Sequence, residues 1–142
     1  MAETGFSSFS TTVDKTNRVL KEIEEANAWP RERRNESYAA LRAVSHALRD
    51  RLTVEETAHL AAQLPMLIRG LYYEGWNPAR VPVKMNKEQF LERVRRDFPF
   101  DVGDDVEPLV HSVLRSLSLH ITDGEWKNIK SSVPKGLAAV LN

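Results

Sequence analysis

The sequence predicts an all-α fold of about eight short helices, arranged as two similar four-helix repeats packed with pseudo-two-fold symmetry. Apolar residues recur with helical spacing along the chain, and no stretch shows the strict alternation of a half-buried strand. Prolines and capping signals divide the chain into short segments. The same signals return 69 residues later, where Thr122 repeats the helix start at Thr53. Pro134 repeats Pro65 in the same register.

Composition sets the class of protein. The 142 residues are 42% apolar and 28% charged, so we expect a single domain, residues 1–142, with its own core. Twenty basic and twenty acidic residues cancel, which argues against a large surface for nucleic acid or anionic membrane. The absence of cysteine excludes disulfides, thiolate metal sites and a cysteine nucleophile. With no signal peptide and no long apolar run, we expect a cytoplasmic protein that does not bind membranes.

The first repeat, about residues 11–76, begins with a helix that Ser10 or Thr11 can cap. We expect this helix to run to about Ala28, and Phe6 and Phe9 to pack over its start.

The second and third helices follow without a long loop. The second is expected to start near Asn35 or Ser37, where an apolar stripe with helical spacing begins. Thr53 and Glu56 have the spacing of a capping box, in which each side chain accepts a hydrogen bond from the other residue's backbone N–H. The third helix is therefore expected to run from Val54 to about Gln63.

The fourth helix is expected to run from Pro65 to about Tyr73, with Gly75 supplying a stop of positive φ. A helical wheel gives it two different faces. We expect the aliphatic face to lie in the core: Leu64, Leu67, Ile68 and Leu71. The opposite face is the candidate interaction face: Arg69, Tyr72, Tyr73 and Trp76.

This candidate interaction face has two interpretations. It could pack against the second half of the chain, or it could meet a protein partner or a second copy, since Tyr, Trp and Arg are enriched at interface hot spots. We expect Trp76 to fold back onto the junction between the halves, and Arg69 and Tyr73 to be exposed.

A linker, residues 77–85, is expected to be extended because it carries two prolines. The second repeat, about residues 86–142, opens with a helix capped at Asn86. An acidic loop then leads to a sixth helix that reaches Ile121, and Thr122 with Glu125 forms a second capping box for the seventh. The last helix starts at Pro134.

The central stretch SHALRDRLTVEETAHLAAQLPMLIRGLYYEGWNP, followed by VKMNKEQFLERV, resembles the bacterial domain-of-unknown-function 2267 family. The resemblance covers most of the chain from about Thr16 onward. It implies an all-helical bacterial cytoplasmic protein, connected with stress physiology, with no established activity or catalytic residues to carry over.

The residues themselves carry little chemistry. The four histidines are scattered and no metal or nucleophile motif occurs, so we expect no catalytic residues, no metal, no cofactor and no small-molecule ligand. The favoured function is a non-enzymatic interaction or scaffold module. One alternative is a helix-turn-helix regulator that binds nucleic acid, but Glu55 and Glu56 would aim carboxylates at phosphates. A second alternative is an enzyme without a recognisable motif.

Overall fold

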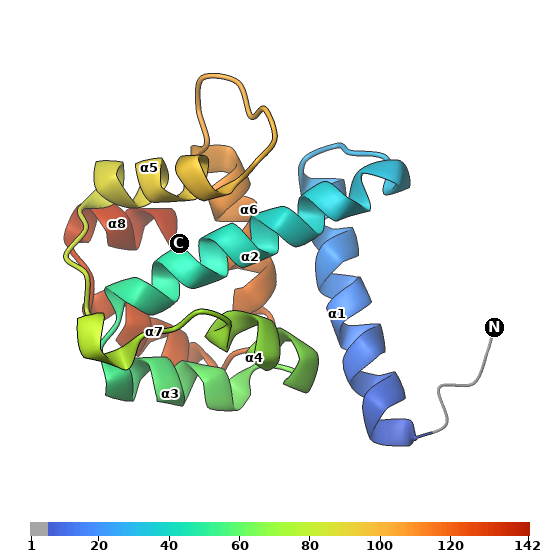
Figure 1. The fold of residues 1–142 in the computed structure, drawn as a ribbon, viewed down its shortest axis with the longest axis horizontal. Coiled ribbons are helices and arrows are strands. Elements are labelled where there is room, and N and C mark those ends of the chain that lie inside the picture. The colour runs from blue at the N-terminus through green and yellow to red at the C-terminus, as the bar shows by residue number, and fades with distance from the viewer. Residues whose placement is uncertain (1–5) are drawn as a thin grey trace.

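The computed structural model describes residues 6–142, and every regular element in that range is helical, which confirms the all-α class. The eight α-helices are α1 (Ser7–Ala26), α2 (Arg34–Arg51), α3 (Val54–Gln63), α4 (Met66–Tyr73), α5 (Lys87–Asp97), α6 (Glu107–Ser118), α7 (Asp123–Ser131) and α8 (Lys135–Val140) (Figure 1). Two 3-10 turns, η1 (Arg31–Arg33) and η2 (Pro78–Arg80), precede α2 and α5. None of the helices in residues 6–142 is long and apolar enough to cross a membrane.

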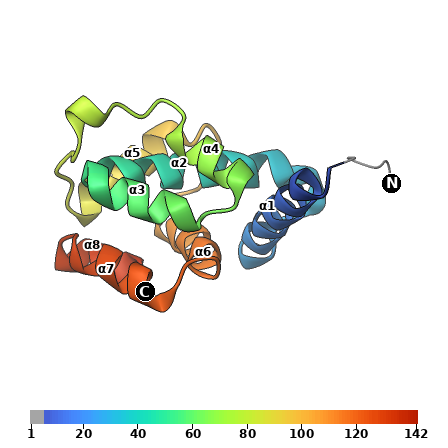
Figure 2. The same cartoon turned by 90° about the horizontal axis from the view of Figure 1, so that it is seen from below.

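Two helices, α2 and α6, pack against each other in the middle of the molecule. Each is covered by the first helix of the opposite half, because α1 packs on α6 and α5 packs on α2. The third helices, α3 and α7, contact each other. Figure 2 shows α7 and α8 lying beneath the layer that holds α2, α3 and α5. Buried apolar side chains from all eight helices form one hydrophobic core.

The predicted helix starts at Thr53 and Asn86 are confirmed as complete capping boxes, with Glu56 and Gln89 as the returning side chains. The box predicted at Thr122 is only half formed. Its hydroxyl accepts from the Glu125 N–H at 3.2 Å, but its own backbone N–H donates to the side-chain oxygen of Gln63.

The start of α1 differs from the prediction. The helix begins at Ser7, and Phe6 occupies the N-cap position without a side-chain hydrogen bond. Ser10 and Thr11 do not cap it, because their hydroxyls donate back to carbonyls four residues earlier; for Thr11 this bond, to the Ser7 carbonyl, is 2.9 Å long. The Phe6 and Phe9 rings do pack edge to face, with centroids 5.3 Å apart.

Smaller differences concern the ends of other helices. The turn η1 starts the chain's second helical segment earlier than predicted, so α2 begins at Arg34. The linker is not wholly extended, because the Asn77 side chain accepts from the Ala79 N–H and supports η2. Helix α6 ends at Ser118, short of Ile121. Gly75 has the predicted positive φ, 76°.

Candidate functional site

The candidate interaction face does not form one exposed surface, because Tyr72 points into the core. Tyr72 is 1% exposed, and its hydroxyl donates to the Thr57 carbonyl on α3 at 3.4 Å. Burial raises the pKa of Tyr72. The prediction that Tyr72 belongs to an interaction surface is therefore wrong: this large side chain fills the space between α3 and α4.

Arg69 is half-buried rather than exposed. Its Nε donates to the Ala61 carbonyl at 2.8 Å, and one terminal nitrogen donates to the Leu64 carbonyl at 2.9 Å. Ala61 lies in the last turn of α3 and Leu64 is its C-cap residue, and the Ala61 carbonyl also accepts from the Leu64 N–H at 3.1 Å. Arg69 therefore ties the end of α3 to α4, with its positive charge at the negative end of the α3 dipole.

Tyr73 and Trp76 are both half-buried, and their rings lie 5.3 Å apart. Tyr73 also contacts Tyr72 edge to face at 5.5 Å and packs against the core. The indole nitrogen of Trp76 is buried without a hydrogen-bond partner within the described residues. The two rings thus form a partly covered aromatic pair beyond the end of α4.

Three side chains of α2 hold the end of α4. Arg49, only 3% exposed, donates to the Tyr72 carbonyl at 2.9 Å and to the Glu74 carbonyl at 2.7 Å. One turn before Arg49, His46 Nε2 lies 2.8 Å from the Leu71 carbonyl. One further turn back along α2, Arg42 forms an ion pair with the Glu74 carboxylate. Because a carbonyl oxygen can only accept, Nε2 is the donor in the hydrogen bond between His46 and Leu71. Burial lowers the pKa of His46.

This anchoring turns part of the aliphatic face of α4 outward. Leu64 and Ile68 are buried as predicted, but Leu67 is 49% exposed and its neighbour Met66 is 52% exposed. Placing Leu67 in the core was wrong, because the wheel cannot show that the bulky Tyr72 takes the inward side. Leu71 is half-buried.

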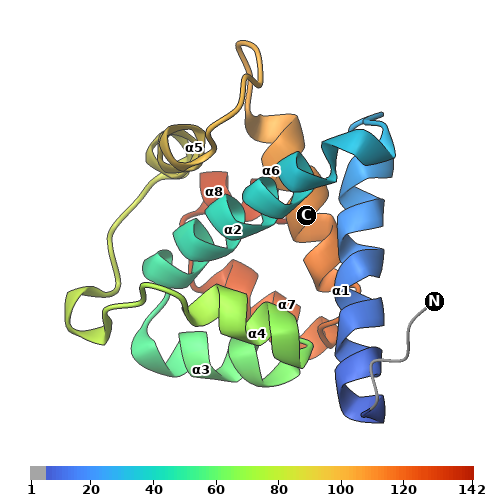
Figure 3. The same cartoon turned by 45° about the vertical axis from the view of Figure 1, so that its right-hand side comes forward.

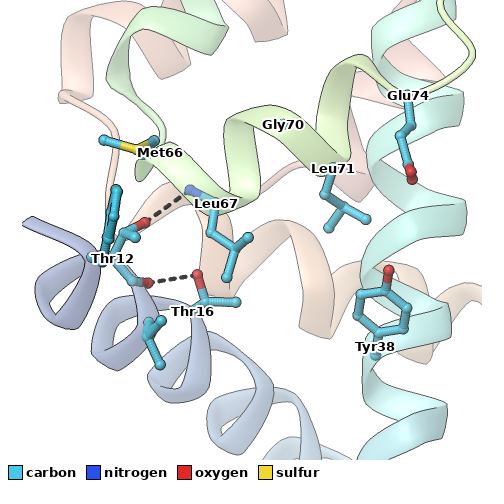
Figure 4. A pocket seen from close by; sticks show the side chains of 10 residues that line it. Thr12, Thr16, Tyr38, Met66, Leu67, Gly70, Leu71 and Glu74 are labelled. Carbon is cyan, nitrogen blue, oxygen red and sulfur yellow. Dashed lines mark hydrogen bonds between the residues drawn. The ribbon is translucent and has the colours of Figure 1, made fainter. Parts of the chain in front are cut away.

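The exposed side of α4 lines a groove of about 600 Å³ between α4, α1 and the start of α2 (Figure 4). Its walls are mostly apolar, and they comprise Phe9, Thr12, Val13, Thr16, Tyr38, Met66, Leu67, Gly70, Leu71 and Glu74. Phe9 is 54% exposed and Tyr38 is 45% exposed, so two of the chain's exposed aromatic rings lie at this groove. A Cβ added at Gly70 would meet nothing within 4 Å.

Three of the four polar side chains that line the groove have partners within the protein. Thr12 Oγ1 accepts from the Leu67 N–H at 2.8 Å, and Thr16 Oγ1 donates to the Thr12 carbonyl at 2.8 Å. Glu74 is paired with Arg42, which lowers the pKa of that carboxyl group. The groove therefore offers apolar contact and shape, with little unsatisfied hydrogen-bonding capacity.

The groove could not be predicted from local sequence patterns, because its residues come from three separate helices. One signal was available: Met66 and Gly70 occupy neighbouring turns on the same side of α4, and glycine is an unfavourable residue inside a helix. The remaining residues, Phe9 and Tyr38 above all, become neighbours only through tertiary packing.

The face of α3 that a helix-turn-helix protein would use is partly occupied. Its last residue, Gln63, accepts a hydrogen bond from Thr122, the N-cap residue of α7, and its acidic first turn lines a pocket together with Glu125. Within residues 6–142 there is no group of three His, Cys, Asp or Glu side chains that could hold a metal ion.

Comparison with known proteins identifies the family to which the chain belongs. No curated protein matches the chain. A family model described as an uncharacterized conserved protein (DUF2267) matches residues 16–140, which is nearly the whole chain and includes seven complete helices. The match begins inside α1, so the groove residues Phe9, Thr12 and Val13 lie before it. The chain belongs to the DUF2267 family.

Proposed function

We propose that this protein is a non-enzymatic interaction module whose groove between α1, α2 and α4 binds the apolar face of an amphipathic helix from a protein partner. The observation that carries the proposal is the concentration of exposed apolar side chains at one groove, where Thr12, Thr16 and Glu74 already have partners within the protein. Phe9, Met66 and Leu67 are each about half exposed there. Contiguous exposed apolar surface of this kind marks interaction sites.

A helix fits the groove better than a small molecule does. Pockets for small ligands combine apolar walls with a few polar groups that fix the ligand's orientation. Here Thr12, Thr16 and Glu74 are all engaged within the protein. An amphipathic helix needs no such groups, since it inserts apolar side chains at i, i+3 and i+7 and keeps its polar face in water.

Site-specific photo-crosslinking in the native host tests this proposal. A benzophenone side chain replaces Leu67 in the groove or, as the matched control, Leu119, which is 64% exposed at the end of α6 outside it. The expected result is one discrete protein adduct from position 67 that is lost when Gly70→Trp fills the groove. Equal adducts from both positions, or an adduct that survives Gly70→Trp, would contradict the proposal.

A non-catalytic role, a cytoplasmic location and a connection with stress physiology form part of this proposal, the last two as the family resemblance implies. Nucleic-acid binding is the competing function. It predicts salt-dependent retardation of duplex DNA in a gel shift. Such retardation would favour the α2–α3 unit over the groove as the functional site.

The two halves are, in this proposal, repeats of one four-helix unit. Exchanging α1–α4 with α5–α8 converts the α1–α6 contact into the α5–α2 contact, and the α2–α4 contact into the α6–α8 contact. A matched pair of hydrogen bonds adds support. Tyr72 donates to the Thr57 carbonyl, while Trp126, 69 residues after Thr57, donates to the Leu141 carbonyl at 3.1 Å. Leu141 lies 69 residues after Tyr72. The aromatic ring is therefore Tyr72 in the first half, whereas in the second half it is Trp126, the counterpart of Thr57.

A further inference from the structure

The first two turns of α1 are packed differently from the rest of that helix. Among residues 7–13 only Thr12 is buried, whereas the buried apolar side chains of α1 all lie from Val19 onward. Phe9 points an exposed ring along the groove instead of into the core. Figures 1 and 3 show this end of α1 projecting beyond α3 and α4. The stretch therefore gains little stability from apolar burial.

The same stretch is also a weak helix by itself. Its sequence, SSFSTTV, consists of residues that favour helix less than Ala, Leu, Glu or Lys do. The N-cap residue Phe6 supplies no side-chain hydrogen bond, and the first turn carries no acidic residue. A helical end with poor propensity and no cap depends on tertiary contacts.

A hydrogen bond from the Leu67 N–H to Thr12 Oγ1 joins this stretch to α4 (Figure 4). Leu67 lies in the first turn of α4, and the N-cap residue of that helix, Pro65, has no side chain that could accept a hydrogen bond. Thr12 thus serves as an N-cap supplied by another helix. Both residues also line the groove.

We infer that residues 7–13 form a hinged flap, which pivots between Val13 and Thr16 and opens when the Thr12–Leu67 hydrogen bond is released. Opening exposes little apolar surface that is not already exposed, so its free energy lies well below that of global unfolding. It carries Phe9 and Thr12 away from α4 and widens the groove. The family match begins at residue 16, where the inferred hinge ends.

Hydrogen exchange followed by mass spectrometry tests the flap without any partner, so the result does not depend on the proposed function. In the wild type, amides of residues 9–13 should exchange at least about 100-fold faster than those of residues 20–26. Thr12→Ala should accelerate exchange in residues 9–13, and at the Leu67 amide, by about fivefold, the effect of losing one net hydrogen bond.

Thr11→Ala is the matched control. Both substitutions raise helix propensity equally, but Thr11 is exposed and bonds only to the Ser7 carbonyl within its own helix. Exchange in residues 9–13 should therefore stay the same or slow in Thr11→Ala. Protection of residues 9–13 equal to that of residues 20–26, or identical behaviour of the two variants, would overturn the inference.

A distance measurement gives an independent readout. The chain has no cysteine, so nitroxide labels on Ser8→Cys and Ala62→Cys, both at exposed positions, report the separation of the flap from the end of α3. Electron paramagnetic resonance should show a second, longer distance population that grows in Thr12→Ala. One narrow population in both proteins would mean that α1 is rigid to its first turn.

Discussion

Gln63, the last residue of α3, exchanges two hydrogen bonds with Thr122, the N-cap residue of α7. The Thr122 N–H donates to the Gln63 side-chain oxygen at 2.8 Å, and the Gln63 amide group donates to Thr122 Oγ1 at 3.4 Å. Gln63 thereby accepts the hydrogen bond from the Thr122 N–H that Glu125 was predicted to accept. A helix start in the second half is completed by a side chain from the first, which fastens the two halves together.

The two helix starts should respond differently to loss of the acidic residue. Glu56→Ala removes both a favourable charge near the helix dipole and the hydrogen bond from the Thr53 N–H, which is 2.9 Å long. Glu125→Ala removes only the charge. In thermal melts Glu56→Ala should cost about 0.5 to 1.5 kcal/mol more than Glu125→Ala. Gln63→Ala should destabilise by about 1 kcal/mol, and a neutral effect would mean that the Gln63–Thr122 pair contributes nothing.

Tyr72 and Thr57 should be energetically coupled. Tyr72→Leu leaves a cavity and Thr57→Trp overfills a fully buried site, so each alone should destabilise by about 1 to 3 kcal/mol. Together they reproduce the arrangement of Leu141 and Trp126 in the second half. The double variant should recover at least about 1 kcal/mol relative to the sum of the single effects. Strict additivity in chemical denaturation would argue against equivalence of the halves.

Arg49 and Arg69 should differ in their contribution to stability. Arg49→Met leaves the Tyr72 and Glu74 carbonyls without their donor at a site that is 3% exposed, and should cost about 3 kcal/mol. Arg69→Met also removes two bonds to carbonyls, but Arg69 is half-buried and water can replace it, so about 1 to 2 kcal/mol is expected. Urea unfolding of both variants measures the difference, and equal losses would refute this ranking of the two sites.

Stability should fall on mild acidification because of two histidines. Burial lowers the pKa of His46 and His120 below the value of 6.5 that applies in the unfolded chain. The stability that these two histidines contribute to the folded state is complete above pH 6.5. It is lost as the pH falls through 6.5 toward the lower folded-state pKa, because the unfolded chain binds the proton first. The carboxyl groups of Asp50 and Asp97, whose pKa is lowered from 3.8, act only at lower pH.

Melts at about pH 7.5 and about pH 5.5, on either side of the unfolded-state histidine pKa, give the measurement. The double change His46→Gln with His120→Gln should flatten the difference between the two pH values. For His46, glutamine retains a side-chain N–H for the Leu71 carbonyl. An unchanged pH dependence would assign the effect to other groups.

Local chemistry made most of the fold predictable. The starts at Thr53 and Asn86 and the stop at Gly75 depend on residues a few positions apart, and the structure confirms them. The start of α1 was wrong because a serine or threonine hydroxyl can cap a helix or bond back to a carbonyl, and the sequence does not distinguish these outcomes.

The site was less predictable, since it depends on competition between side chains for the core. Both Leu67 and Tyr72 are suited to burial, and the periodicity of α4 offers either face. The structure buries Tyr72 because Arg49 and His46, distant in sequence, hold the end of α4 in one orientation. Burial of Tyr72 leaves Leu67 exposed beside Phe9 and Tyr38, and these three side chains then line the groove. No local sequence pattern predicts this arrangement.

The most direct test of the groove as the binding surface is an NMR titration with a helical peptide selected by display on the immobilised protein. We expect backbone amide shifts to gather at Thr12, Leu67 and Leu71, and Gly70→Trp to abolish binding. Ala139→Trp, which places the same ring at the matching exposed position of α8, should bind as the wild type does. Shifts centred on Tyr73 and Trp76, or undiminished binding to Gly70→Trp, would contradict the assignment of function to the groove.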